Sequence, residues 1–263
     1  KEIEYEIIVV NDCSNDNTSS VLKNFHDITL IEHNKNKGYG ASIKTGILES
    51  KNDIIAITDA DGTYPNDKIL QFFNLLSRKN FDMVVGSRTG KNVNIPLIRR
   101  PAKWFIGQLA NYVTNQKIPD INSGLRIFKK KSFLNFISII PDGFSLTTTI
   151  TLGMLSGGYK VKFKDIDYFK RSGKSKIKPI RDTINFVKLI LKMGLFFAPL
   201  KIFLPLSFFI FLLSFIWGMI SKFYFGLLAD VSVLILSMAA FQTMLFALIA
   251  ELINRRLPNR YNK

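Results

Sequence analysis

Residues 53–62 read DIIAITDADG, an apolar and β-branched run that ends in two carboxylates. An uninterrupted run of this kind is typical of a strand that is buried in a parallel sheet. Asp59 and Asp61 flank a single alanine, so their side chains can converge on a hard divalent cation at the end of the strand. An isolated Asp-x-Asp pair is more often a solvated turn. The position of this pair directly after IIAIT is what favours a metal site.

Strand-like runs recur on both sides of this one. They are EIIVV (6–10), ITLIEH (28–33) and FDMVVGSR (81–88), and the helical patterns between them cover 16–25, 41–50 and 66–78. Strands that alternate with short helices predict an α/β sheet with parallel character. Ligands bind such sheets beyond the carboxyl ends of the strands, where Asn11-Asp12, Asp59–Asp61 and Gly86–Arg88 fall. The sequence has neither a GxGxxG nor a P-loop motif, which argues against a dinucleotide site and a P-loop site.

A very apolar tail follows this part of the chain. Residues 202–250 contain only two charged residues, Lys222 and Asp230. The uncharged runs 202–221 and 231–250 each have about the 20 residues that a helix needs to cross the hydrocarbon core of a membrane. The alternative is a pair of buried core helices, which rarely run so far without a charge. Basic residues beyond both outer ends predict a hairpin of two transmembrane helices with both of those ends in the cytoplasm.

The positive charge is concentrated next to the apolar tail. The chain of 263 residues has a formal charge of +16, of which residues 159–201 contribute +9. Charge in this position favours an anionic membrane surface and a phosphorylated substrate rather than nucleic acid. With 47% hydrophobic residues the chain can form a core, and its single cysteine, Cys13, excludes a disulfide framework.

Two further segments have apolar residues at helical spacing, 101–116 and 179–199. Trp104, Lys188 and Lys192 are interspersed in them. Helices of this kind can lie in the headgroup layer and deliver a lipid phosphate to a site. For 101–116, ordinary packing onto the domain is an equal alternative, whereas 179–199 leads directly into the first span and favours the interface.

Six motifs stand in a fixed order along the chain. They are VNDCSNDNT (10–18), NKGYGASIKTG (36–46), DADGTYP (59–65), GSR (86–88), DINSGLR (120–126) and RSGKSKI (171–177). In this order they resemble family 2 glycosyltransferases, and most of all the membrane-anchored polyprenyl-phosphate glycosyltransferases of the dolichol-phosphate mannose synthase-like group. The resemblance implies an α/β fold of the GT-A type, with a Rossmann-like mixed sheet. Family members usually open with one more strand, so it also implies that the chain is N-terminally truncated and lacks the first strand.

The resemblance implies a role for each matching position. Asp12 would contact the nucleotide, and Asp59 and Asp61 would hold Mg²⁺ or Mn²⁺ on the donor diphosphate. The catalytic residues would be Asp61, Arg88 and Asp120, the last of these in a motif that lines the sugar and acceptor side. The acceptor phosphate would be approached by Arg88, Arg99, Arg100, Lys103, Ser123 and Arg126. A mobile loop that closes on the donor phosphates would contain Arg171, Ser175 and Lys176.

The implied reaction moves a sugar from a nucleoside diphosphate sugar to a polyprenyl phosphate, dolichyl or undecaprenyl, with inversion at the anomeric carbon. A phosphate monoester has a second pKa near 6, so the acceptor is already largely dianionic at pH 7 and needs no strong general base. The two histidines of the sequence, His26 and His33, are accordingly expected to be surface residues without a role.

Two alternative functions stay open. One is a membrane glycosyltransferase that extends a polysaccharide, although such enzymes have a QxxRW-type motif and more membrane helices than this sequence contains. The other is a catalytically inactive membrane scaffold with the same fold. The sequence specifies neither the sugar nor the nucleotide nor the oligomeric state, and a homo-oligomer is compatible with it.

The sequence therefore predicts four parts. They are a GT-A-like catalytic domain (1–178), an amphipathic interface helix (179–199), two transmembrane helices (200–251) and a basic cytoplasmic tail (252–263).

Overall fold

The computed structural model describes residues 3–90, 100–143, 145–169, 179–226 and 231–256. The chain divides into two compact units, one containing Lys1–Leu189 and the other Ile190–Arg260. The boundary lies within helix α7 (Pro179–Phe197). The first unit contains the sheets and the second the long apolar helices.

A pair of parallel strands begins the first unit. β1 (Ile7–Asn11) and β2 (Ile28–Glu32) pair in register, from Ile7 opposite Ile28 to Asn11 opposite Glu32, and α1 (Thr18–Leu22) connects them. The backbone N–H of His33 donates to the carbonyl of Asn11 at 2.9 Å, which extends the pairing by one residue. Both predicted strands are confirmed, and the residues that follow them, Asp12 and His33, are adjacent.

The main sheet is mixed, as predicted. Its four strands are β3 (Ile54–Ile57), β4 (Met83–Ser87), β5 (Arg126–Lys129) and β6 (Val161–Asp165), in the order β3-β5-β4-β6. β4 and β6 are parallel, whereas β5 runs antiparallel to both β3 and β4. The predicted strand over 53–62 is shorter in the structure, because the chain leaves the sheet after Ile57 and turns at Gly62, which has a φ of 70°.

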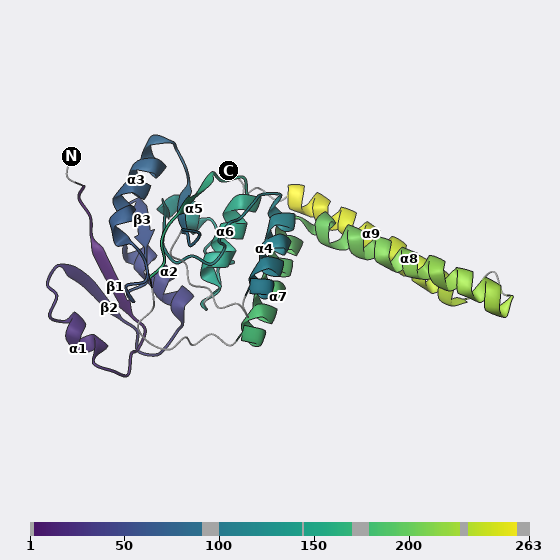
Figure 1. Cartoon of the computed structure of the whole chain (residues 1–263), viewed down its shortest axis with the longest axis horizontal. Coiled ribbons are helices and arrows are strands. Elements are labelled where there is room, and N and C mark those ends of the chain that lie inside the picture. The colour runs from purple at the N-terminus through teal and green to yellow at the C-terminus, as the bar shows by residue number, and fades with distance from the viewer. Residues whose placement is uncertain (1–2, 91–99, 144, 170–178, 227–230, 257–263) are drawn as a thin grey trace. The chain divides into compact units, whose positions relative to one another are not determined.

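Helices cover the sheets (Figure 1). They are α2 (Tyr39–Glu49), the 3₁₀ turn η1 (Asn66–Lys68), α3 (Ile69–Arg78), α4 (Arg100–Thr114), α5 (Lys130–Leu134) and α6 (Leu146–Ser156). Phe72 and Leu76 of α3 form one core cluster with Val84, Leu125 and Ile127. α6 is buried over residues 146–155 in spite of its threonines, because their hydroxyls bond to nearby polar groups.

The start of α2 lies against the turn at residues 141–142. A methyl group on Gly40 would come within 2.2 Å of the carbonyl oxygen of Pro141, so this position admits no side chain. The backbone N–H of Ala41 donates to the carbonyl of Asp142 at 3.1 Å, and Lys44 pairs with the carboxylate of Asp142 at 2.5 Å. These contacts fix the start of α2 and the Lys37–Gly38 backbone in front of it.

The second unit is a hairpin of two long apolar helices, α8 (Pro199–Phe225) and α9 (Val231–Arg256), which lie side by side in Figure 1. The hydroxyl of Ser207 donates to the carbonyl of Ala240 at 2.8 Å, and that of Ser214 to the carbonyl of Val233 at 2.9 Å. Later residues of α8 thus pair with earlier residues of α9, so the helices are antiparallel. Both are long and apolar enough to cross a membrane. Small residues between the helices, such as Ala240 and Ala247, permit their close approach, as is common in membrane helix pairs.

We predict that Gly40→Ala lowers the free energy of unfolding by about 1–3 kcal/mol, because the added methyl forces the start of α2 away from the 141–142 turn. Gly107→Ala in α4 is the matched control, since a methyl group at this position would meet no atom within 4 Å. The control should be neutral or more stable by about 0.5–1 kcal/mol. Thermal unfolding of the purified variants measures both, and equal melting temperatures for the two would contradict the packing described.

Candidate active site

Polar residues from separate segments meet at one edge of the sheets. Asp59 and Asp61 follow β3, and Arg88 follows β4. Because β5 is antiparallel to these strands, its first residue lies at the same edge, where Arg126 pairs with Ile57 and Val85. The segment that precedes β5 therefore brings Asp120 to the edge that the sequence analysis predicted.

Arg88 and Asp120 form a bidentate ion pair at this edge. Arg88 Nε donates to Asp120 Oδ2 at 2.7 Å, Nη2 donates to Oδ1 at 2.9 Å, and the backbone N–H of Arg88 donates to Oδ2 at 3.0 Å. Burial alone would lower the pKa of the Arg88 guanidinium, but the hydrogen bonds and charge of Asp120 outweigh it and raise that pKa above its ordinary value. Arg88 also lies over the ring of Tyr168, 5.2 Å from its centroid. The pair thus holds one cation in a fixed orientation at the sheet edge.

Two tyrosines bond to groups around Asp59, one from α2 to its carboxylate and the other to the segment before β5. Tyr39 Oη donates to Asp59 Oδ1 at 3.3 Å, and Tyr64 Oη accepts the backbone N–H of Gly124 at 2.7 Å. A side chain at position 124 would come within 2.8 Å of Asp59 Oδ2. Burial and the charge of Asp59 raise the pKa of Tyr39, so its hydroxyl stays protonated and remains a donor.

Asp61 is oriented by its own turn. Its Oδ1 accepts the hydroxyl of Thr63 at 2.6 Å and the backbone N–H of Thr63 at 3.2 Å. Asp59 and Asp61 together offer carboxylate oxygens, the ligands that Mg²⁺ and Mn²⁺ prefer. In the described part of the chain no three His, Cys, Asp or Glu residues gather as a metal cluster. A cation here would therefore take its other ligands from a substrate or from water.

Asp12 lies beyond β1 and is held by three donors. His33 Nδ1 lies 2.8 Å from Asp12 Oδ1, and the backbone N–H groups of Lys37 and Gly38 donate to the same carboxylate, each at 2.8 Å. Burial alone would raise the pKa of Asp12, but the hydrogen bonds from these three residues outweigh it and lower the pKa.

The sequence analysis wrongly predicted that His33 is a surface residue. It is 7% exposed rather than a surface residue, and its Nε2 lies 3.0 Å from the hydroxyl of Thr45 in α2. His33 thus connects Asp12 to α2. Its position directly after β2 was the signal that could have revealed this, because parallel strands place the residues after them side by side.

Arg126 lies in the interior, at 1% exposure. Its Nη1 donates to the carbonyl of Thr147 at 3.0 Å and to the hydroxyl of Thr151 at 3.1 Å, and its Nη2 donates to the carbonyl of Ser123. Burial lowers the pKa of Arg126 to about 10. The predicted contact of Arg126 with an acceptor phosphate does not fit this placement, because the guanidinium is enclosed by protein. Ser123, at 0% exposure, does not fit the same predicted role either.

Other predicted site residues cannot be placed. Arg99, Arg171, Ser175 and Lys176 lie outside the residues that the structure describes. Arg100 and Lys103 belong to α4, but their side chains are not among those described. The structure adds Tyr39, Tyr64, Tyr168 and His33 to the predicted set. Tyr39 and Tyr64 lie within the quoted motifs and Tyr168 lies outside them, and nothing in the sequence distinguished the three from core aromatic residues.

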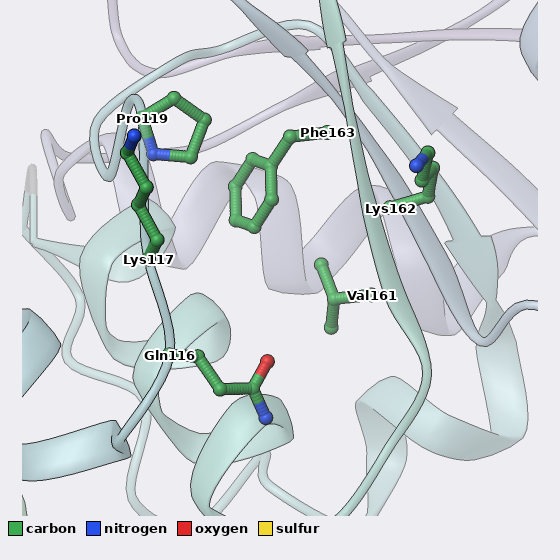
Figure 2. A pocket seen from close by; sticks show the side chains of 6 residues that line it. All are labelled: Gln116, Lys117, Pro119, Val161, Lys162 and Phe163. Carbon is green, nitrogen blue, oxygen red and sulfur yellow. The ribbon is translucent and has the colours of Figure 1, made fainter.

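A separate hollow lies beside the edge strand β6 (Figure 2). It is lined by Gln116, Lys117, Pro119, Val161, Lys162 and Phe163. None of the residues that form the candidate site lines it. The segment that passes the hollow continues through Pro119 into Asp120.

Comparisons with known proteins agree with this geometry. The family model described as glycosyl transferase family 2 matches residues 1–136, and the model described as GtrB C-terminal hairpin matches residues 198–255. A dolichyl-phosphate hexose transferase of Haloferax volcanii is 25% identical over 189 residues, which cover 72% of this chain and 81% of the relative. A dolichyl-phosphate beta-glucosyltransferase of Trichomonas vaginalis is 31% identical over 143 residues, which cover 50% of this chain but only 42% of the relative.

A solved structure shows the same fold. Glucosyl-3-phosphoglycerate synthase of Mycobacterium tuberculosis, in complex with Mn²⁺, uridine diphosphate and phosphoglyceric acid, superposes with a TM-score of 0.54 at 12% sequence identity. The match covers 72% of this chain and 67% of that chain. The first unit therefore has a fold of the GT-A type.

We predict that the stability contributed by Asp12 depends on pH. Its pKa in the folded protein is below the ordinary value of 3.8, so its contribution is complete above about pH 4 and is lost as the pH falls through the lower, folded pKa. Asp12→Asn should therefore be less stable than wild type at pH 7, and the difference should narrow below about pH 4.

Unfolding by urea at several pH values measures this difference. Asp67→Asn is the control, since Asp67 is exposed and its carboxylate pairs with its neighbour Lys68 at 3.3 Å. Asp67→Asn should change the free energy of unfolding little at any of these pH values. A difference for Asp12→Asn that stays constant with pH would show that the carboxylate charge is not what the three donors stabilise.

Proposed function

Because the chain belongs to glycosyl transferase family 2, we propose that it moves a sugar from a nucleoside diphosphate sugar to a polyprenyl phosphate. Relatives named as dolichyl-phosphate hexose and glucosyl transferases support the acceptor. The match of residues 198–255 to the GtrB C-terminal hairpin supports a membrane-bound enzyme that meets a lipid. The proposed reaction inverts the anomeric configuration, because the acceptor attacks the side opposite the departing diphosphate.

One observation carries this proposal. The carboxylates of Asp59 and Asp61 lie at the same sheet edge as the oriented cation of Arg88. The two carboxylates suit a metal-bound diphosphate, and the guanidinium of Arg88 suits a phosphate without a metal. A site with both can hold two phosphorylated substrates at once, and the apolar hairpin explains why one of them is a lipid.

A divalent cation fits the donor side of the site. Asp59 and Asp61 would hold it, and when bound it would neutralise charge on the departing diphosphate. Tyr39 bonds to Asp59 and Thr63 bonds to Asp61, so each carboxylate is oriented before substrate arrives. The carboxylate ligands suit Mg²⁺ and Mn²⁺ alike.

The acceptor side is built on Arg88. Its guanidinium would pair with the lipid phosphate. Asp120 would hold the guanidinium in position through Nε and Nη2. The phosphate is largely dianionic at pH 7, so orientation rather than proton removal is the main requirement. Further acceptor contacts are proposed for Arg99, Arg100 and Lys103.

Donor contacts are proposed for Asp12 on the nucleotide and for a loop that contains Arg171, Ser175 and Lys176. Three donors already hold Asp12, which fixes its carboxylate against the backbone of Lys37 and Gly38. This rigidity suits a residue that recognises one part of a substrate.

We further propose that the enzyme works at the cytoplasmic face of the membrane. Basic residues lie beyond both outer ends of the hairpin, and the positive-inside rule then favours a cytoplasmic position for those ends. The domain boundaries proposed from the sequence agree with this arrangement, with the catalytic part before the hairpin and a short basic tail after it.

A membrane-interface role is also proposed for α4. Its solvent-facing residues include Trp104, Phe105 and Tyr112, at 66%, 51% and 48% exposure. Its opposite face is buried through Ile106, Ala110 and Val113. Aromatic side chains of this kind favour the headgroup layer of a membrane.

We predict that the full-length protein, reconstituted with polyprenyl phosphate and Mn²⁺ or Mg²⁺, forms a lipid-linked sugar from at least one of a panel of nucleotide sugars. Asp61→Asn should lower turnover by at least about a hundredfold, because an amide is a poor substitute for an anionic metal ligand. Asp67→Asn, which changes an exposed carboxylate outside the site, should leave turnover unchanged. Extraction of radiolabelled lipid measures the product. Lipid-linked sugar from Asp61→Asn at the wild-type rate would overturn the metal assignment.

We predict that Trp104 lies in the headgroup layer. The sequence has two tryptophans, so Trp217→Phe leaves Trp104 as the single tryptophan, whose emission can be excited selectively. In vesicles with brominated acyl chains its fluorescence should be quenched, most strongly with bromines near the headgroups. Trp104→Phe, which leaves Trp217 in α8, should be quenched most strongly by bromines deeper in the bilayer. Unquenched emission from Trp104 would place α4 in water.

A further inference from the structure

The hairpin presents one amide on its outer surface. α9 contacts α8 through Ala240 and Ala247, which are 3% and 0% exposed. Successive residues of an α-helix are turned by about 100°, so Gln242 points about 160° away from Ala240 and about 140° away from Ala247. Gln242 is exposed, in agreement with this geometry. Its side chain therefore faces away from α8.

The surroundings of Gln242 are apolar. Its neighbours one helical turn away on the same face, Met238 and Phe246, are 62% and 64% exposed. Between Val231 and Glu251 the helix contains no charged residue. Glu251 lies about 14 Å further along the helix axis than Gln242. In a membrane the amide would thus lie within the hydrocarbon layer.

The other polar side chains near this depth are satisfied inside the hairpin. Ser214 bonds to Ser237 and to the carbonyl of Val233, and the hydroxyl of Thr243 donates to the carbonyl of Ala239 at 2.8 Å. Over the described residues of both helices, Gln242 has no hydrogen-bond partner. An amide in hydrocarbon without a partner costs several kcal/mol, by transfer measurements.

We propose that a second copy of this chain covers this face, with the two Gln242 side chains hydrogen-bonded to each other across a two-fold axis along the membrane normal. An amide has both a donor and an acceptor, so two symmetry-related glutamines satisfy each other. All copies insert with the same orientation, which brings both amides to the same depth. The rest of the face is uncharged, so it suits an identical apolar face and offers no ion pair to a different protein.

The first test compares association of the full-length variants in mild detergent by sedimentation equilibrium. Wild type should be dimeric, and Gln242→Leu should dissociate roughly tenfold more readily, as expected for the loss of interhelical hydrogen bonds. Thr243→Val is the matched control at the same depth, because its hydroxyl bonds within its own helix. It should associate as wild type does. A monomeric wild type, or equal association of Gln242→Leu and wild type, would overturn the proposal.

The second test locates the contact in vesicles. Cys13 is the only cysteine and is replaced by serine in all variants. Met238→Cys, on the same face as Gln242, should form disulfide-linked dimers on oxidation, and adding Gln242→Leu should reduce them severalfold. Met244→Cys, which points about 160° away from Gln242, should form few.

Equal cross-linking at positions 238 and 244, or cross-linking at 238 that does not depend on Gln242, would contradict the proposed face. Neither measurement requires sugar transfer. A failure of the proposed activity would therefore leave this result standing, and the reverse also holds.

Discussion

The buried guanidinium of Arg126 is the interaction on which the site depends. It bonds to the carbonyls of Ser123 and Thr147, and so fixes the segment before β5 to helix α6. That segment brings Asp120 to Arg88. Placing a cation in the protein interior has a large desolvation cost, which is tolerated only where hydrogen bonds are well made. Here carbonyl and hydroxyl oxygens supply them to Nη1 and Nη2, whereas Nε is buried without a partner among the described residues. The position of the Arg88–Asp120 pair thus depends on a charge that is itself buried, at 1% exposure.

Hydrogen bonds within the protein also orient the carboxylates for which donor contacts are proposed. Each of them accepts a bond from the backbone or from a neighbouring hydroxyl. Asp12, Asp59 and Asp61 all accept hydrogen bonds before any ligand is present. Preorganised groups need little rearrangement when charge develops, which is the main electrostatic contribution a protein makes to such a reaction. The site therefore combines oriented carboxylates with an oriented guanidinium at one edge of a mixed sheet, as the proposed donor and acceptor sides require.

Much of this could be predicted from the sequence. The apolar runs that end in Asp12, Asp59 and Arg88 predicted strands and the edge where their polar ends meet, because strand periodicity and burial are local properties. The uncharged lengths of the tail predicted the two long helices for the same reason. Contacts between distant segments could not be predicted in this way. His33 and Arg126 look like ordinary polar residues in the sequence, and only the pairing of β1 with β2, and of β5 with its neighbours, determines that both are buried.

The position of β6 has a consequence for how the protein is made. The last strand of the main sheet ends at Asp165, well before the first long apolar helix begins at Pro199. Synthesis proceeds from the N-terminus, so the strands that the structure describes leave the ribosome before α8 and α9 do. Domains generally fold as units in this order. The first unit can therefore complete its hydrogen-bonded sheets before the two long apolar helices have been synthesised.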